Sequence, residues 1–232
     1  MSLRPVVAEF AGTAMLLAAV VGSGITAERL CGGNVALALL ANALATGGAL
    51  VALILAFGPI SGAHFNPAVT LADAWRGGLA WAGVAPYVGA QVAGALFGTA
   101  LANAMFGLPP FFASHHARSG PAMLVSEFVA TFGLLATIWG CARSRREATP
   151  YAVAAYIVAA YWFTPSTSFA NPAVTIARSL TDTFAGIRPV DVPPFILAQL
   201  LGALFATALF AWFGAARTSD AALVTLPHEA VS

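Results

Sequence analysis

Long stretches without a charged residue most restrict what this chain can fold into. Between Arg29 and Asp73 lie 43 residues with no Asp, Glu, Lys or Arg. A helix needs about 20 apolar residues to cross a bilayer, so this stretch is too long for one helix. Only 8% of the 232 residues are charged, too few for a polar surface. The composition excludes a soluble globular enzyme, a disordered chain and a basic nucleic-acid binder, and it indicates a polytopic protein of the lipid bilayer.

The uncharged stretches, divided at Gly, Pro and polar clusters, predict an all-α membrane protein. Its fold class is six transmembrane helices plus two re-entrant half-helices. We place the full helices near residues 6–24, 33–56, 81–106, 121–142, 150–163 and 193–216. The half-helices lie near 67–76 and 172–182, and each is opened by Asn-Pro. The fifth full helix is short for a membrane span, so we expect it to begin or end beyond these limits.

The second half of the chain repeats motifs of the first half in the same order. Asn-Pro-Ala-Val-Thr at 66–70 recurs at 171–175, and Val-Ala-Glu-Phe at 7–10 is echoed by Val-Ser-Glu-Phe at 125–128. We therefore predict one domain over residues 1–232, built from repeats at about 5–107 and 121–216. Each repeat holds three spans, and this odd number inverts the second copy, so that interrupted helices meet near the bilayer midplane.

Each Asn-Pro-Ala motif is chemically suited to a helix start inside a membrane. Pro fits the first helical position, where its missing N–H would have no partner. The preceding Asn can cap the helix with its side-chain oxygen, which leaves its amide nitrogen free to donate. A helix break in a membrane must be packed in protein or line a watery cavity, so the two Asn should face each other across a pore. The predicted pore residues are Asn66, Pro67, Ala68, Asn171, Pro172 and Ala173.

Glu9 and Glu127 lie inside predicted spans, where carboxylates are rare and face the bundle interior. One interpretation is a carboxylate pair of an intramembrane enzyme or a proton-coupled transporter. The other is a supporting role, in which each carboxylate accepts backbone N–H groups of the unwound segment before Asn-Pro-Ala. The placement of one Glu in each repeat favours support. His64 is expected to bond the same loop or line the inner vestibule, and no spacing of His and Cys predicts a metal site.

The basic residues predict how the chain is oriented. Arg143, Arg145 and Arg146 form the one dense basic loop, which should be cytoplasmic. With six spans, both termini are then cytoplasmic, and the expected location is the cell (inner) membrane. The loops at 107–120 and 164–192 face outward, and we expect His115 and His116 on the surface of the first of these.

Both Asn-Pro-Ala motifs, the segment Ser-Gly-Ala-His-Phe-Asn-Pro-Ala-Val-Thr at 61–70 and the two Glu-bearing helices resemble the aquaporin and aquaglyceroporin (major intrinsic protein) family. The resemblance extends over about residues 5–216. It implies a homotetramer with one pore per subunit and passive conduction of water or small uncharged solutes. It also implies that the protein is not an enzyme and binds no cofactor.

A second constriction of this family lies outward of the paired Asn. Counted from the motifs, its four positions are Thr46, Ala159, Ser168 and Val174. Family members usually have Arg directly after the second Asn-Pro-Ala and an aromatic residue in this ring, whereas this chain has Val174 and no aromatic among the four. The resemblance therefore implies a wide and mostly neutral constriction.

Val174 and the following segment 175–189 are similar to the arsenic-associated branch of bacterial aquaglyceroporins. This similarity implies that arsenite and methylated arsenicals pass beside water and glycerol. An ordinary water or glycerol facilitator is the alternative.

Arg178 lies four residues beyond Val174, one turn further along the second half-helix. We favour a surface ion pair with Asp182 at i, i+4. The other interpretation is a positive charge displaced to the outer vestibule, where it concentrates weakly acidic solutes.

Overall fold

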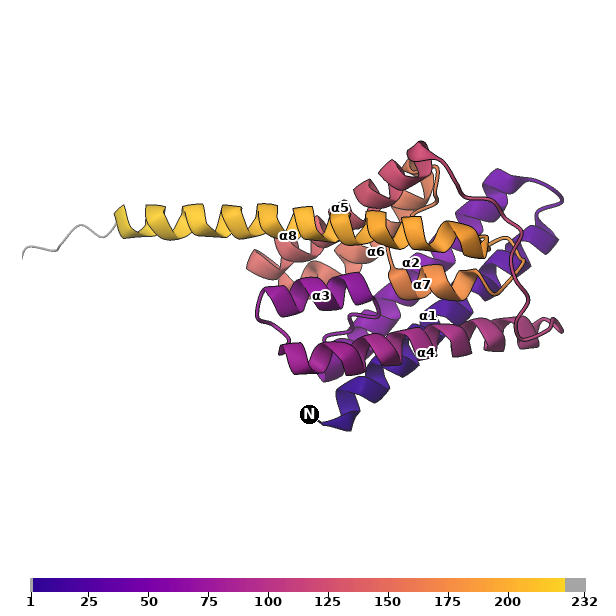
Figure 1. Ribbon diagram of the computed structural model, residues 1–232, viewed down its shortest axis with the longest axis horizontal. Coiled ribbons are helices and arrows are strands. Elements are labelled where there is room, and N and C mark those ends of the chain that lie inside the picture. The colour runs from indigo at the N-terminus through magenta and orange to yellow at the C-terminus, as the bar shows by residue number, and fades with distance from the viewer. Residues whose placement is uncertain (1, 224–232) are drawn as a thin grey trace, which may run out of the picture.

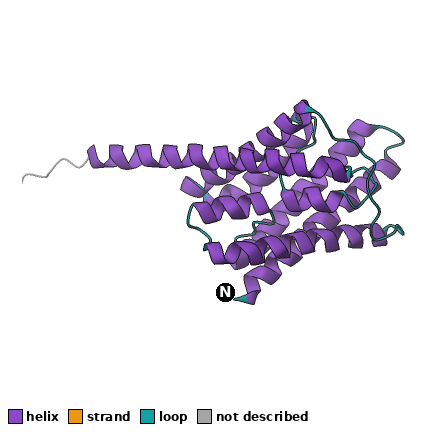
Figure 2. Ribbon diagram, viewed as in Figure 1, coloured by secondary structure: helices purple, strands orange, loops and turns teal. Residues whose placement is uncertain are grey.

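The computed structural model describes residues 2–223, and its elements are α-helices and short 3-10 turns, with no strand in that range (Figures 1 and 2). The helices are α1 (Leu3–Leu30), α2 (Val35–Ser61), α3 (Pro67–Trp75), α4 (Trp81–Met105), α5 (Pro121–Ser144), α6 (Thr149–Phe163), α7 (Pro172–Arg178) and α8 (Val192–Leu223). The 3-10 turns are η1 (Arg146–Ala148) and η2 (Pro189–Asp191).

The predicted fold class is confirmed, because six long helices and two short ones appear in the expected order. Within residues 2–223, five helices are long and apolar enough to cross a membrane. The remaining long helix, α6, has 15 residues, so it extends beyond the expected limits by only one residue, Thr149. The prediction of a half-helix over 172–182 was too long at its end, because α7 stops at Arg178.

Local sequence explains where the helices begin and end. Asn34 caps α2, since its Oδ1 accepts the N–H of Leu37 at 3.1 Å. Pro121 and Pro150 lie in the first turns of α5 and α6, where a missing N–H has no cost. Gly62 ends α2 in the left-handed region at φ 86°.

Small residues bring the long helices into close contact, as expected for helices packed in lipid. Gly94 and Gly98 of α4 lie against the backbone of α1 at Phe10 and Ala14, and a Cβ at either glycine would collide with it. Gly202 of α8 packs in the same way against α5. The pairs α1–α4 and α5–α8 are therefore equivalent contacts, one in each half of the chain.

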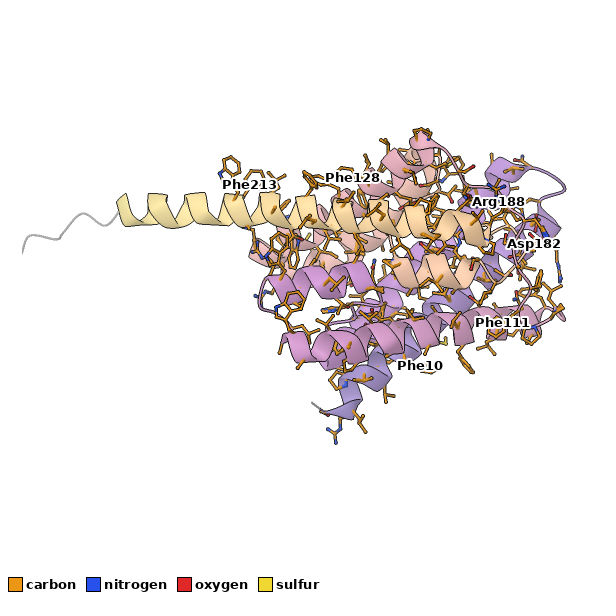
Figure 3. All side chains as sticks on the ribbon, in the orientation of Figure 1. Phe10, Phe111, Phe128, Asp182, Arg188 and Phe213 are labelled. Carbon is orange, nitrogen blue, oxygen red and sulfur yellow. The ribbon has the colours of Figure 1, made fainter. Side chains whose placement is uncertain are left out.

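The two short helices lie end to end in the middle of the bundle, between α4 and α8 (Figure 1). Their N-terminal ends meet, and their C-terminal ends point in opposite directions. The N-terminus and the far end of α8 lie at the same end of the molecule. The outer surface carries many large apolar side chains, such as Met15, Phe97 and Phe205, which suit a lipid environment (Figure 3).

Candidate functional site

The two Asn-Pro-Ala segments touch each other at the centre of the bundle. The Oδ1 of Asn66 accepts the N–H of Ala68 at 2.9 Å, and the Oδ1 of Asn171 accepts that of Ala173 at 3.0 Å. Both Asn therefore cap their helices. The Nδ2 of Asn66 donates to the carbonyl of Ala170 at 2.7 Å, and that of Asn171 donates to the carbonyl of Phe65 at 2.7 Å.

These crossed bonds refine the prediction that both amide nitrogens are free. Each side-chain amide carries two hydrogens, and one of them links Asn66 or Asn171 to the opposite segment. The second hydrogen of each has no acceptor among the described residues. Each Asn thus has one N–H available to a molecule in the adjoining cavity.

The loops before the two Asn share an uncommon backbone conformation. Ala63 and Phe65 have φ of 50° and 48°, and the equivalent Ser168 and Ala170 have φ of 50° and 48°. Left-handed conformations at non-glycine residues cost of order 1–3 kcal/mol each and persist only where the surroundings hold them. Something in the bundle must therefore fix both loops.

Buried carboxylates hold both loops. Glu9 has no exposed surface, and it accepts the N–H groups of His64 at 3.0 Å and Phe65 at 2.7 Å. Glu127, equally buried, accepts those of Phe169 and Ala170, each at 2.9 Å. This geometry matches the supporting interpretation of the two carboxylates.

Two glutamines that were not among the predicted site residues complete this support. The Nε2 of Gln91 donates to Glu9 at 2.8 Å and to Thr70 at 2.8 Å. The Nε2 of Gln199 donates to Glu127 at 2.6 Å and to Thr175 at 2.8 Å. The two glutamines open similar segments in both halves, Gln-Val-Ala-Gly at 91–94 and Gln-Leu-Leu-Gly at 199–202, and this recurrence was the available signal.

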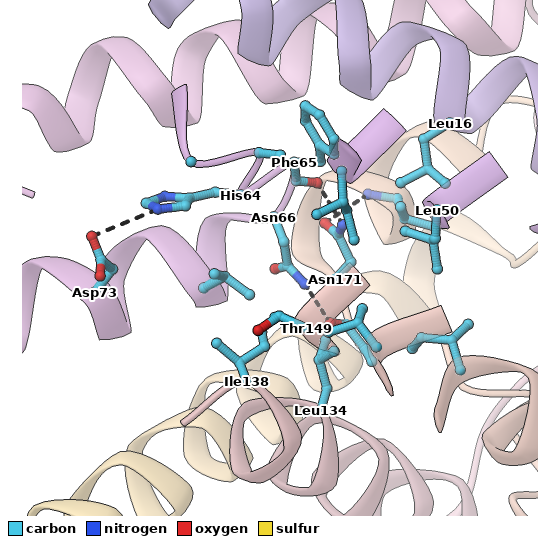
Figure 4. Close-up of a pocket in the computed structure, with 18 of the residues that line it drawn as sticks. Leu16, Leu50, His64, Phe65, Asn66, Asp73, Leu134, Ile138, Thr149 and Asn171 are labelled. Atoms are coloured by element: carbon cyan, nitrogen blue, oxygen red, sulfur yellow. Dashed lines mark hydrogen bonds and ion pairs between the residues drawn. The ribbon is translucent and has the colours of Figure 1, made fainter. Parts of the chain in front are cut away.

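A cavity of about 500 Å³ runs past both Asn (Figure 4). Its wall includes Asn66 and Asn171, together with Thr46, Ser168 and Val174 from the predicted constriction. Apolar side chains such as Leu50, Leu134 and Ile157 form much of the remaining wall. The cavity wall is therefore mostly apolar and carries a small number of polar groups.

The structure does not place Ala159 in this wall. Ala159 lies exposed on the outside of α6, whereas Ile157 and Tyr161 line the cavity. Residues 157 and 161 share a helix face because they are four apart, and residue 159 points elsewhere. The expectation of a constriction without an aromatic was thus wrong, since Tyr161 lies in the wall and its hydroxyl is 3.3 Å from that of Thr46.

The predicted ion pair of Arg178 with Asp182 is also wrong. Because α7 ends at Arg178, no helical turn carries the chain on to Asp182. Arg178 is instead 2% exposed and belongs to the cavity wall, where its Nε donates to the carbonyl of Ala185. Its guanidinium carbon lies 3.4 Å from the centre of the Phe169 ring.

His64 and Asp73 lie at the other end of the cavity, beside α3 (Figure 4). The Nδ1 of His64 is 3.1 Å from the hydroxyl of Thr70, and its Nε2 is 3.6 Å from a carboxylate oxygen of Asp73. The backbone N–H of His64 thus bonds Glu9 of α1, while its ring bonds Thr70 of α3 and lines the cavity. Asp73 was not among the predicted site residues.

Asp182 organises the outer loop rather than α7. It accepts the backbone N–H and the ring Nδ1 of His115, each at 2.8 Å. These bonds from His115 hold the pKa of Asp182 below its ordinary value. His115 and His116 lie at the surface, as expected. Among the described residues, no group of three or more His, Cys, Asp or Glu is arranged to hold a metal ion.

Comparison with known proteins identifies the family of the chain. The sequence pattern described as "Major intrinsic protein" matches residues 1–165. The aquaglyceroporin AqpS of Rhizobium meliloti (strain 1021) is 59% identical over 209 residues, which cover 90% of this chain and 89% of that protein. The chain belongs to the major intrinsic protein family.

This major intrinsic protein has further relatives in plants and among solved structures. Aquaporin NIP1-3 of Oryza sativa subsp. japonica is 36% identical over 76% of this chain and 63% of its own length. The X-ray structure of the aquaglyceroporin from Plasmodium falciparum has the same fold, with a TM-score of 0.65 at 21% identity, over 90% of this chain and 95% of that one. With this family and its apolar helices, the chain is a multi-pass membrane protein.

Proposed function

We propose that this protein is a passive transmembrane channel for small uncharged solutes, and that arsenite and methylated arsenicals pass with water and glycerol. The observation that carries the proposal is the cavity that runs past both Asn-Pro-Ala segments. The 59% identity to a protein named aquaglyceroporin AqpS supports a solute channel. The fixed contacts of the two half-helices favour passive conduction over large alternating movements.

In this proposal, different residues of the cavity wall have different roles in conduction. Asn66 and Asn171 each offer one N–H to a solute at the centre, where the positive ends of α3 and α7 disfavour cations. The outer constriction is formed by Thr46, Ser168, Val174 and Tyr161, the last of these in place of the predicted Ala159. Glu9 and Glu127 keep the loops in shape and carry no proton across the membrane.

The chemistry of the solutes fits this wall. Arsenous acid is a neutral, polyol-like molecule at neutral pH, so it can exchange water contacts for the Asn amides and the loop carbonyls. A methylated arsenical adds one apolar group. Val174 offers an apolar surface to this group, whereas an Arg at the same position would fill the cavity. The same wall accepts glycerol, which has alternating hydroxyl and CH faces.

We also propose a homotetramer in the cell inner membrane, with both termini cytoplasmic. The exposed apolar side chains of the long helices leave ample surface for contacts with lipid and with neighbouring subunits. The basic loop at Arg143, Arg145 and Arg146 supports the orientation. The start of α1 and the last turns of α8 lie on the same side, which agrees with an even number of spans.

Purified protein in liposomes tests the proposal. Stopped-flow light scattering would measure water and glycerol flux. Uptake of arsenite and of methylarsonous acid, the trivalent methylarsenical that is neutral at pH 7, would be measured on the same vesicles, with protein-free liposomes as the control. We expect all four solutes to pass faster than in the control. Fast water flux without organoarsenical uptake would favour an ordinary facilitator, and saturable, proton-dependent uptake would favour a carboxylate-driven transporter.

A further inference from the structure

The two ends of the cavity carry opposite charges at equivalent positions of the repeat. Asp73 follows Asn66 by seven residues, and Arg178 follows Asn171 by seven. Among the described residues of the wall, these are the single Asp or Glu and the single Arg. Each lies next to the ring that comes two residues before its Asn, His64 in one repeat and Phe169 in the other.

Arg178 is fixed in place rather than free to swing into solvent. Its guanidinium stacks on Phe169 at 3.4 Å, and its Nε is bonded to the carbonyl of Ala185. Phe169 packs edge-on against the buried Phe195 at 5.4 Å between ring centres. A cation stacked on an aromatic ring in a site with little water is held firmly.

Arg118 reinforces this arrangement from the outer loop. Its guanidinium carbon is 5.0 Å from the centre of the Phe169 ring. Its Nε donates to the carbonyl of Gly186 at 2.8 Å, and one Nη donates to the carbonyl of Ser166 at 3.1 Å. Arg118 thus ties together the two segments that flank α7. The guanidinium groups of Arg118 and Arg178 both lie against the Phe169 ring.

Hydrogen-bonding capacity remains unused beside Arg178. Among the described residues, only its Nε has an acceptor, so both Nη groups are available to a molecule in the cavity. The hydroxyl of Ser168 is buried in the same wall and has no partner in the described part of the chain. Unpartnered buried donors are costly unless something occupies the site.

We propose that Arg178 is the specificity-determining cation of this end of the cavity. Its two Nη groups donate to the oxygen atoms of a passing neutral solute, and its charge excludes cations. The guanidinium faces the cavity one helical turn beyond Val174. The apolar side chain of Val174 is therefore free to contact a non-polar part of the solute. The preferred solute therefore has several oxygen atoms on one side and an apolar group on the other. This inference rests on the proposed channel function.

Arg178→Met, which keeps most of the side-chain volume without the charge, tests the inference in proteoliposomes. The readouts are the ratio of glycerol to water flux and the cation leak reported by an internal pH-sensitive dye under an imposed potential. We expect the cation leak to rise about tenfold, which corresponds to about 1.4 kcal/mol of barrier, and the glycerol-to-water ratio to fall. Arg178→Lys should keep the low leak but lose glycerol preference, because it lacks the planar pair of donors.

Arg29→Gln is the matched control, because Arg29 is an exposed arginine at the end of α1 outside the cavity wall. It should match the parent in both readouts. An unchanged leak and an unchanged flux ratio in Arg178→Met would overturn the inference. If the Arg178 variants do not fold, Phe169→Leu removes the ring beneath the guanidinium, and an unchanged ratio there would overturn it as well. A parent that conducts neither water nor glycerol would instead refute the channel itself.

Discussion

Replacing Glu127 with Gln should destabilise the protein and disturb the loop before Asn171. The carboxylate accepts three N–H donors: the backbone groups of Phe169 and Ala170 at 2.9 Å and the Nε2 of Gln199 at 2.6 Å. A glutamine of the same shape keeps one acceptor oxygen. Its NH₂ group must then face a donor that the carboxylate had satisfied.

The cost follows from these contacts. The substitution loses at least one hydrogen bond to a charged group, worth about 1.5–3 kcal/mol, and it leaves a buried donor unpaired at about 1–3 kcal/mol. Since Glu127 has no exposed surface, water cannot replace the lost bond. We expect the free energy of unfolding to fall by roughly 3–5 kcal/mol, a large share of the total for a typical protein.

Unfolding of the purified protein in mixed detergent micelles would measure this loss of stability. Stopped-flow water flux would report the effect on conduction through the cavity. The matched control is Glu28→Gln, because Glu28 is exposed near the end of α1, and it should change stability by less than about 0.5 kcal/mol. Parent-like stability and water flux in Glu127→Gln would refute the supporting role. Parent-like stability with loss of proton-dependent uptake would indicate a proton-transferring carboxylate.

Three further predictions concern the constriction, the helix packing and the outer loop. Val174→Arg should narrow the lane and cut methylarsenical uptake more than water flux, and equal uptake by mutant and parent would contradict our view of the constriction. Gly98→Ala should lower the free energy of unfolding by about 1–3 kcal/mol because its Cβ meets the backbone of α1. The matched control is Gly89→Ala, which has open space around it and should leave the free energy of unfolding unchanged or raise it by up to about 1 kcal/mol. Asp182→Asn should lower the melting temperature slightly at pH 7. This difference should vanish as the pH falls through the lowered pKa of Asp182, because the parent carboxyl is then also neutral. A difference that persists in acid would show that the bonds from His115 do not depend on the charge.

Much of the fold follows from the sequence alone. The uncharged stretches determine where the chain can cross a bilayer, and Asn-Pro marks the two places where a helix restarts inside it. The carboxylates could be paired with their loops because each repeat holds one Glu inside a predicted membrane span and one such loop. Such inferences use only composition and order along the chain.

The side chains that face the cavity were harder to predict. Counting back from Asn171 selected Ala159, but the rotation of α6 about its axis, set by packing against its neighbours, turns Tyr161 inward instead. Arg178 was assigned to the surface because the sequence shows an acidic residue four positions on and does not show that α7 stops first. Helix rotation and helix ends depend on tertiary contacts that local patterns do not contain.

The dependence of solute flux on its driving force tests the central claim most directly. In proteoliposomes under a series of glycerol gradients, with and without a proton gradient, the rate of swelling should rise in proportion to the glycerol gradient and be the same in both conditions. A rate that saturates, that requires the proton gradient, or that equals the rate of protein-free liposomes would contradict an open lane between Asn66 and Asn171.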